Sequence, residues 1–301
     1  MGEKNPKKNS DLLQRTLVNG LGAMFIALFL FLAEIPPLRW LYAGAVAAIA
    51  AVALWEYYQI VRKKGLYPAL LLGLISTVLY VFAIFCKTQG PHQFWPSFWQ
   101  QAPEIILALA FFGCFVYFTV VGKSPILNIS TTFLGIVYIG VPLGIFVRIM
   151  YFFPDMGNQD LHFRGSFWII YLIAVTKSGD IGGYFIGRFF GRKKLAHKLS
   201  PNKTFEGSIG GLVASTLVSL FLCFLGQEIG GGFIDFTYVQ SIYLGLIVGV
   251  MGQLGDLAES FLKRDAKVKD SNSIPGVGGI LDMVDSLLFS APVVYMFLKL
   301  T

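Results

Sequence analysis

Long apolar runs recur along almost the whole chain, and short polar segments separate them. A run of about 20 apolar residues is long enough to cross a bilayer as a helix. The pattern predicts nine such spans, at about residues 16–34, 40–61, 67–86, 103–121, 129–152, 166–187, 207–227, 238–259 and 279–298. We therefore expect an all-α polytopic membrane protein that forms a single integral-membrane domain over residues 1–301.

The composition supports this fold class and narrows the kinds of site to consider. Of the 301 residues, 55% are hydrophobic and 14% are charged, and the mean hydropathy is +0.66. Soluble domains carry about 25% charged residues. Cys86, Cys114 and Cys223 lie within or at the edge of apolar runs, and the three histidines are scattered. This spacing indicates neither a disulfide framework nor a zinc site, so a metal site would have to be made of carboxylates.

The distribution of basic residues predicts the orientation of the spans. The N-terminal segment and the loops after the second, fourth, sixth and eighth spans hold 18 of the 24 lysines and arginines, and the opposite side holds four. Because cytoplasmic loops are enriched in Lys and Arg, we expect a cytoplasmic N-terminus and an external C-terminus. Topology accounts for most of the net charge of +7, so we do not expect nucleic-acid binding.

The first polar block is VTKSGDIGGYFIGRFFGRKKLAHKLSPNKTFEGSIGG, residues 175–211. Lys177 and Asp180 are spaced to pair on one helix face, either to fix helix packing or to line a polar cavity. Ser200 followed by Pro201 is typical of a helix start. Such a helix N-terminus, with the Lys203 and Thr204 side chains, would suit a phosphate group. The alternative is a capped helix without a ligand.

The second polar block includes the end of the eighth span and the start of the ninth. If the eighth helix continues, Asp256, Ser260, Lys263 and Lys267 share one face. Asp282 and Asp285 lie on the first turns of the ninth span. A helix dipole favours acidic residues at such a position, which explains one of these two aspartates better than both.

Three aspartates, Asp256, Asp282 and Asp285, have no His or Cys nearby in the sequence. Carboxylate oxygens are the ligands that Mg²⁺ prefers, together with the phosphates of a substrate. Aspartates, lysines and glycine-rich turns together are typical of phosphoryl or nucleotidyl transfer. The residues alone thus predict a magnesium-dependent membrane enzyme that acts on a phosphate compound at the cytoplasmic face.

The run SFLKRDAKVKDSNSIPGVGGILDMVDS resembles the signature of the phosphatidate cytidylyltransferases, S-x-x-K-R-x4-K-D followed by P-x-H-G-G and D-R-x-D. The segment GDIGGYFIGRFFGRKKLAHKLSPNKTFEG resembles the other characteristic block of that family. The two blocks cover residues 177–211 and 252–286. On this resemblance, residues 129–301 form the catalytic region and residues 1–128 the N-terminal spans.

The resemblance implies transfer of CMP from CTP to phosphatidic acid, which gives CDP-diacylglycerol and pyrophosphate. It implies Mg²⁺, as one or two divalent or mixed cations, with Asp256, Asp282 and Asp285 as metal ligands, and these three act in catalysis together with Lys263. The residues expected to bind substrate are Asp180, Ser200, Lys203, Thr204, Lys263, Arg264, Lys269 and Asp270. The implied setting is a bacterial inner (plasma) membrane, with CTP, phosphatidic acid and membrane lipids as partners. A homodimer is compatible with the resemblance.

The chain departs from the family signature at two positions. Val277 stands where the family has His, and Met283 stands where it has Arg. The spacer after Asp270 is also one residue short. In contrast, Lys177 stands where the family has an uncharged residue, which leads to the hypothesis that it supplies a missing positive charge.

Two other functions remain open at this point. One is a CTP-dependent polyprenol kinase, whose alcohol nucleophile would need a base. The other is a transporter of a phosphorylated solute, which would be expected to show inverted repeats and broken helices in both halves. The polar residues concentrate in the second half of the chain, which argues against the transporter.

Overall fold

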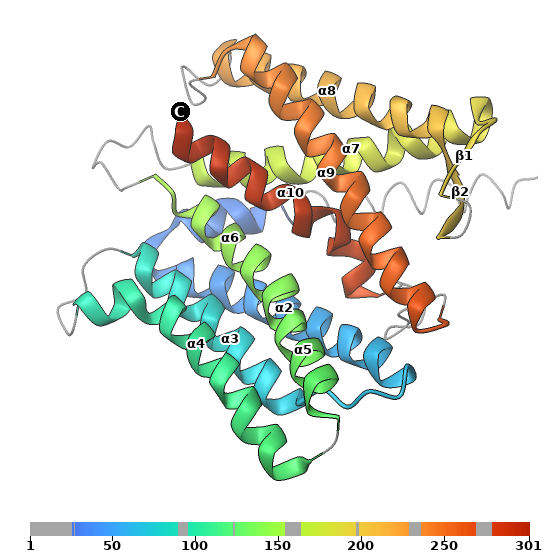
Figure 1. Ribbon diagram of the computed structural model, residues 1–301. Coiled ribbons are helices and arrows are strands. Elements are labelled where there is room, and N and C mark those ends of the chain that lie inside the picture. Colours follow the sequence, from blue (N-terminus) through green and yellow to red (C-terminus); the bar gives the residue numbers. More distant parts are fainter. Residues whose placement is uncertain are drawn as a thin grey trace, which may run out of the picture.

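The computed structural model describes residues 26, 28–89, 96–122, 124–153, 164–196, 199–228, 236–268 and 279–301, and these are overwhelmingly helical (Figure 1). The helices are α2 (Arg39–Lys63), α3 (Leu70–Thr88), α4 (Pro96–Val121), α5 (Pro125–Gly135), α6 (Val141–Met150), α7 (Arg164–Phe190), α8 (Phe205–Glu228), α9 (Tyr238–Asp265) and α10 (Ile280–Leu300). A 3₁₀ turn, η1 (Pro36–Leu38), precedes α2, and a π-helical turn, η2 (Ile136–Gly140), joins α5 to α6.

The helices confirm the predicted class of an all-α polytopic membrane protein. Within the described residues, eight helical segments are long and apolar enough to cross a membrane, and they correspond to the second to ninth predicted spans. The helix of the fourth predicted span begins seven residues before its predicted start and contains Pro103. The first predicted span lies mostly outside the described residues. The orientation of the termini stays a prediction.

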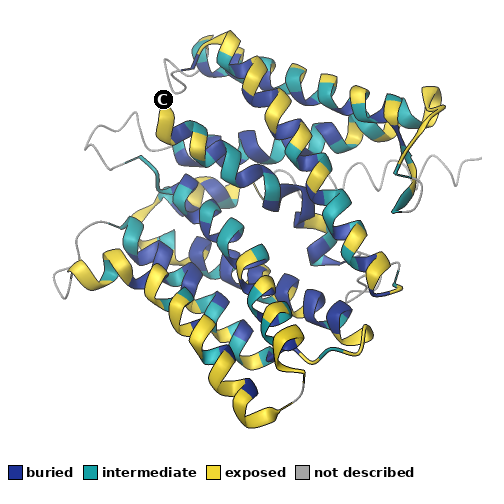
Figure 2. Ribbon diagram, in the orientation of Figure 1, coloured by how far each residue is buried: buried dark blue, intermediate teal, exposed yellow. Residues whose placement is uncertain are grey.

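The helices form two groups with α10 between them. Helices α2 to α6 lie on one side, α7 to α9 lie on the other, and α10 contacts α9 and α7 as well as α6 and α2 (Figure 1). Buried residues line the surfaces between neighbouring helices, while the outward faces of α4 and α8 show many exposed positions (Figure 2). Exposed apolar side chains are expected on faces that meet lipid. Helix α10 therefore joins the two halves of the fold.

Helices α7 and α8 pack so closely that glycine is required between them. A Cβ at Gly207 would come within 2.7 Å of the carbonyl oxygen of Gly183, and one at Gly211 would come equally close to that of Gly179. Small residues allow this approach between membrane helices. The glycines of the first polar block thus serve close helix contact.

A two-stranded hairpin between α7 and α8 differs from the prediction. Strands β1 (Lys194–Ala196) and β2 (Ser200–Thr204) pair antiparallel, with Lys194 opposite Thr204 and Ala196 opposite Ser200. The expected helix start at Ser200 is wrong. A residue before proline is biased toward extended backbone, and strand pairing keeps the segment extended as far as Thr204. The hydroxyl oxygen of Thr204 then accepts a hydrogen bond from the backbone N–H of Gly207, with 3.1 Å between the two atoms, and so caps the N-terminus of α8.

Candidate active site

A polar pocket of about 300 Å³ lies between α7, α9 and α10. Its lining residues are Lys177 and Asp180 from α7, Asp256, Glu259, Ser260, Lys263 and Arg264 from α9, and Asp282 and Asp285 from α10. Ionisable groups are costly within a membrane and usually mark function. The fold thus brings both polar blocks of the sequence to one place.

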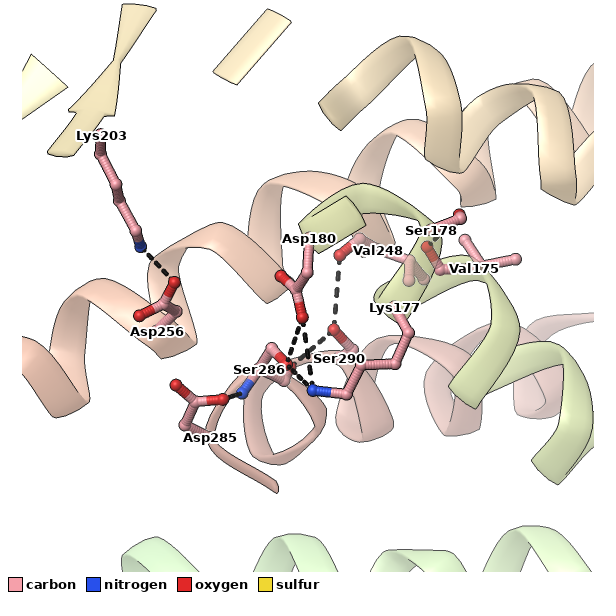
Figure 3. Close-up of polar contacts among 10 residues, drawn as sticks. All are labelled: Val175, Lys177, Ser178, Asp180, Lys203, Val248, Asp256, Asp285, Ser286 and Ser290. Atoms are coloured by element: carbon pink, nitrogen blue, oxygen red, sulfur yellow. Dashed lines mark hydrogen bonds and ion pairs between the residues drawn. The ribbon is translucent and has the colours of Figure 1, made fainter. Parts of the chain in front are cut away.

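A second cavity of about 440 Å³ adjoins the polar pocket and shares Asp180 and Asp256 with it. Its walls include the glycine-rich faces of α7 and α8, Gln253 from α9, and Lys203 and Thr204 from the hairpin. The ammonium of Lys203 lies 2.5 Å from a carboxylate oxygen of Asp256, as Figure 3 shows. The hairpin therefore extends the site, because its lysine reaches a carboxylate that faces both cavities.

Lys263 is a buried cation that links two helices. Its side chain pairs with Glu259 at 3.0 Å, one turn earlier on α9, and with Asp282 on α10. Lys263 is 7% exposed and Glu259 is 3% exposed. A buried charge needs such partners, because removing it from water without them is costly.

Lys177, Asp180 and Ser286 form a second polar link, between α7 and α10 (Figure 3). The ammonium of Lys177 lies 3.3 Å from Asp180 and donates to the hydroxyl of Ser286 at 3.0 Å. That hydroxyl in turn lies 3.2 Å from the same Asp180 oxygen. The predicted pairing of Lys177 with Asp180 is confirmed, and it lies in the wall of the pocket.

Two features fix α10 and its aspartates against the rest of the fold. The carboxylate of Glu56, which is 1% exposed, accepts the backbone amides of Ile280 at 3.0 Å and Leu281 at 2.7 Å. At the contact between α9 and α10, a Cβ on Gly255 would collide with the carbonyl oxygen of Asp285. Helix α2 therefore holds the start of α10. The absence of a side chain at Gly255 allows α9 and α10 to pack closely.

Comparison with known proteins identifies the family. A sequence profile described as the cytidylyltransferase family matches residues 13–301. The chain belongs to the cytidylyltransferase family. Its residues are 36% identical to a phosphatidate cytidylyltransferase of Chlamydia pneumoniae over 298 residues, which cover 97% of this chain and 93% of that protein. The phosphatidate cytidylyltransferase of Bacillus subtilis is 33% identical over 296 residues, which cover 96% and 98% of the two chains.

The structure brings together most of the residues that the family signature suggests. Asp180, Asp256, Lys263, Arg264, Asp282 and Asp285 line the polar pocket, and Lys203 and Thr204 line the adjoining cavity. Their proposed roles stay predictions. Ser200 pairs in the hairpin and is not among the residues that line either cavity.

Other predicted features lie outside the site or outside the described residues. Lys269 and Asp270 belong to the residues that the structure does not describe, as does Val277. Helix α9 ends at Asp265, so the condition under which Lys267 would share the face of Asp256 and Lys263 is not met. Met283 is 49% exposed and does not line the pocket.

Two functional candidates were missed from sequence. Glu259 lies one turn from Lys263, so the i, i+4 spacing could have identified their pairing. Glu56 is an acidic residue within an otherwise apolar span, and an intramembrane carboxylate is itself a signal of function. The sequence does not indicate that Glu56 contacts α10, because the residues that it contacts there lie 224 and 225 residues later in the chain.

The oxygen ligands around the polar pocket are of the chemical type that binds a hard divalent cation. Five carboxylates line it, and neither His nor Cys is among its described lining residues. Within the described part of the chain, no three acidic, His or Cys side chains stand together as a complete ligand cluster. Mg²⁺ is commonly held by one or two carboxylates plus substrate phosphates, so the arrangement fits an ion that is completed by substrate.

Proposed function

We propose that this protein transfers CMP from CTP to phosphatidic acid, which forms CDP-diacylglycerol and pyrophosphate. The observation that carries the proposal is the convergence of acidic and basic side chains from three membrane helices on one pocket. Family membership supports it, and the relatives compared above are named phosphatidate cytidylyltransferases. The setting we propose is the bacterial plasma membrane, with the pocket facing the cytoplasm.

The proposed reaction follows from the charges of the two substrates. A phosphate oxygen of phosphatidic acid attacks the α-phosphorus of CTP in line, and a new P–O bond forms. The bond between the α-phosphorus and its bridging oxygen breaks, and pyrophosphate leaves with that electron pair. The nucleophile is an anion at neutral pH, so the chain needs no strong general base.

The residues of the pocket divide between holding cations and binding anions. Asp256, Asp282 and Asp285 would hold Mg²⁺, which supplies positive charge between the two anionic substrates. Lys263 and Arg264 lie near the end of α9 at the same pocket, and we assign them to the phosphates of CTP. Cations placed there stabilise the charge that builds on pyrophosphate as it leaves.

Labelled CTP tests this function directly. Purified protein is incubated with Mg²⁺, phosphatidic acid and CTP that carries label at the α-phosphate, and the lipid phase is then extracted. We expect label in the lipid and equal release of pyrophosphate. Folded protein that gives no lipid label would contradict the proposal. Label that enters lipid only from γ-labelled CTP would identify a kinase instead.

A further inference from the structure

Lys177 lies at the middle of α7 and lines the polar pocket. It precedes the end of the helix at Phe190 by 13 residues, which corresponds to about 20 Å along the axis. Lys263 and Arg264 are within two residues of the end of α9 at Asp265. Lys177 therefore reaches the pocket from the middle of one helix, while Lys263 and Arg264 reach it from near the end of another.

The contacts of Lys177 leave part of its donor capacity for a ligand. An ammonium group has three N–H donors, and the described contacts of Lys177 are Asp180 at 3.3 Å and Ser286 at 3.0 Å. The side chain keeps 36% of its surface exposed and lines the pocket. Lys263, in contrast, is buried between two carboxylates. Lys177 is thus held in place by two acceptors without being enclosed by them.

The charge balance of the pocket gives this lysine a role beyond packing. The described lining residues comprise five carboxylates and three cations. Both proposed substrates are anions. Mg²⁺ on Asp256, Asp282 and Asp285 would offset part of the negative charge of the wall, and each lysine or arginine of the lining adds to that offset. Lys177 is the cation that α7 contributes to the described lining.

We propose that Lys177 binds a phosphate group of a substrate, with Asp180 and Ser286 holding its ammonium in position. This inference rests on the proposed function and adds a substrate-binding residue to it. The phosphate could belong to the lipid or to CTP. Met283, where the family signature has Arg, is half exposed and is not part of the pocket wall. The hypothesis that Lys177 replaces the charge of that arginine stays a prediction.

Three variants separate phosphate binding from a structural ion pair. Lys177→Gln removes the charge but can still hydrogen-bond to Asp180 and Ser286, and Lys177→Arg keeps the charge. Lys87→Gln is the matched control, because Lys87 pairs with Glu104 on α4 at 2.9 Å and does not line the pocket. For each protein, kcat and the KM of each substrate are measured with the labelled-CTP assay. Thermal unfolding in detergent is followed with and without CTP and phosphatidic acid.

We expect Lys177→Gln to raise the KM of one substrate about tenfold or more, the size of a lost charge-assisted hydrogen bond. Lys177→Arg should lose much less, and Lys87→Gln should match the wild type. A raised KM for phosphatidic acid assigns Lys177 to the lipid phosphate, and a raised KM for CTP assigns it to the nucleotide. Unchanged KM values, with or without a lower melting temperature, would identify a structural ion pair and overturn the inference.

The same measurements distinguish this inference from the proposed function. Wild-type protein that transfers no label to lipid would overturn the function itself. The rise in melting temperature on adding CTP or phosphatidic acid would then still test the role of Lys177. A smaller rise in Lys177→Gln than in the wild type supports anion binding by Lys177. An equal rise contradicts it.

Discussion

At the scale of single residues, the sequence predicts some groups of the polar pocket and its support, and gives no indication of others. Asp256, Asp282 and Asp285 could be identified because acidic residues are costly in or beside apolar spans and usually mark a functional site there. Glu56 could not be matched to its role, since its partners are backbone amides 224 and 225 residues later. A backbone partner leaves no side-chain signature to search for. The sequence thus identifies the charges of a site more readily than the groups that position it.

Asp282→Asn is expected to abolish turnover while the protein still folds. The substitution removes the charge that pairs with Lys263 and that we assign to the metal, and its side chain is 35% exposed, so the shape is tolerated. Loss of groups that merely support a metal ligand costs about 10- to 100-fold, so we expect a larger loss here. The labelled-CTP assay measures it.

Asp265→Asn is the matched control for this variant. Asp265 ends α9 and pairs with Lys64 at an exposed position away from the pocket lining. We expect it to keep wild-type activity. Normal activity in Asp282→Asn would remove that residue from the site.

At the scale of elements, the long helices are predictable and the hairpin is not. Apolar runs of the length of a bilayer specify helices because unpaired backbone groups are costly in lipid. The segment from Lys194 to Thr204 is polar, and its fold depends on pairing between two short strands. No alternation of apolar and polar residues indicates those strands. The contacts between helices were also beyond prediction, because hydropathy does not state which faces meet.

Gly255→Ala tests how closely α9 must approach α10. The added methyl group would collide with the carbonyl oxygen of Asp285, so the helices must separate or rotate, and Asp285 must move. We expect turnover to fall by about 100-fold, as for other small misplacements of catalytic groups. Gly44→Ala in α2 is the control, because no atom beyond the neighbouring backbone of its own helix lies within 4 Å of the position that its Cβ would take. Equal activity of the two variants would show that this contact does not set the site.

Glu56→Gln tests the attachment of α10 to α2. The amide side chain can accept one of the two backbone amides, and its NH₂ group would face the other, so we expect a cost of about 1–3 kcal/mol at this contact. Hydrogen–deuterium exchange should become faster at the first turn of α10, and kcat should fall. Glu104→Gln, which breaks an exposed pair on α4, should change neither. Unchanged exchange at α10 would contradict the role of Glu56.

At the scale of the whole molecule, the orientation in the membrane is the main prediction still to be tested. The eight helical spans within the described residues do not decide it, because the first predicted span lies mostly outside them. The loop at Gly65, between α2 and α3, is predicted to be cytoplasmic, and the C-terminus is predicted to be external. Whether two copies associate also stays a prediction.

Reporter fusions test the orientation. We expect alkaline phosphatase joined after Thr301 to be active, since it folds only outside the cytoplasm, and a fluorescent protein joined there to be dark. Fusions that end at Gly65 should give the opposite pattern, and they serve as the internal control. The same pattern at both positions would contradict the predicted topology.

The place of α10 in the chain has a consequence for how the protein is made. Asp282 and Asp285 are on α10, which leaves the ribosome after α2 to α9, and Glu56, which holds that helix, is inserted into the membrane much earlier. Every nascent chain that ends before α10 lacks two of the carboxylates that we assign to the reaction. A growing or prematurely terminated polypeptide is therefore expected to be catalytically inactive. Activity is expected only after α10 has been synthesised and has packed between the two halves.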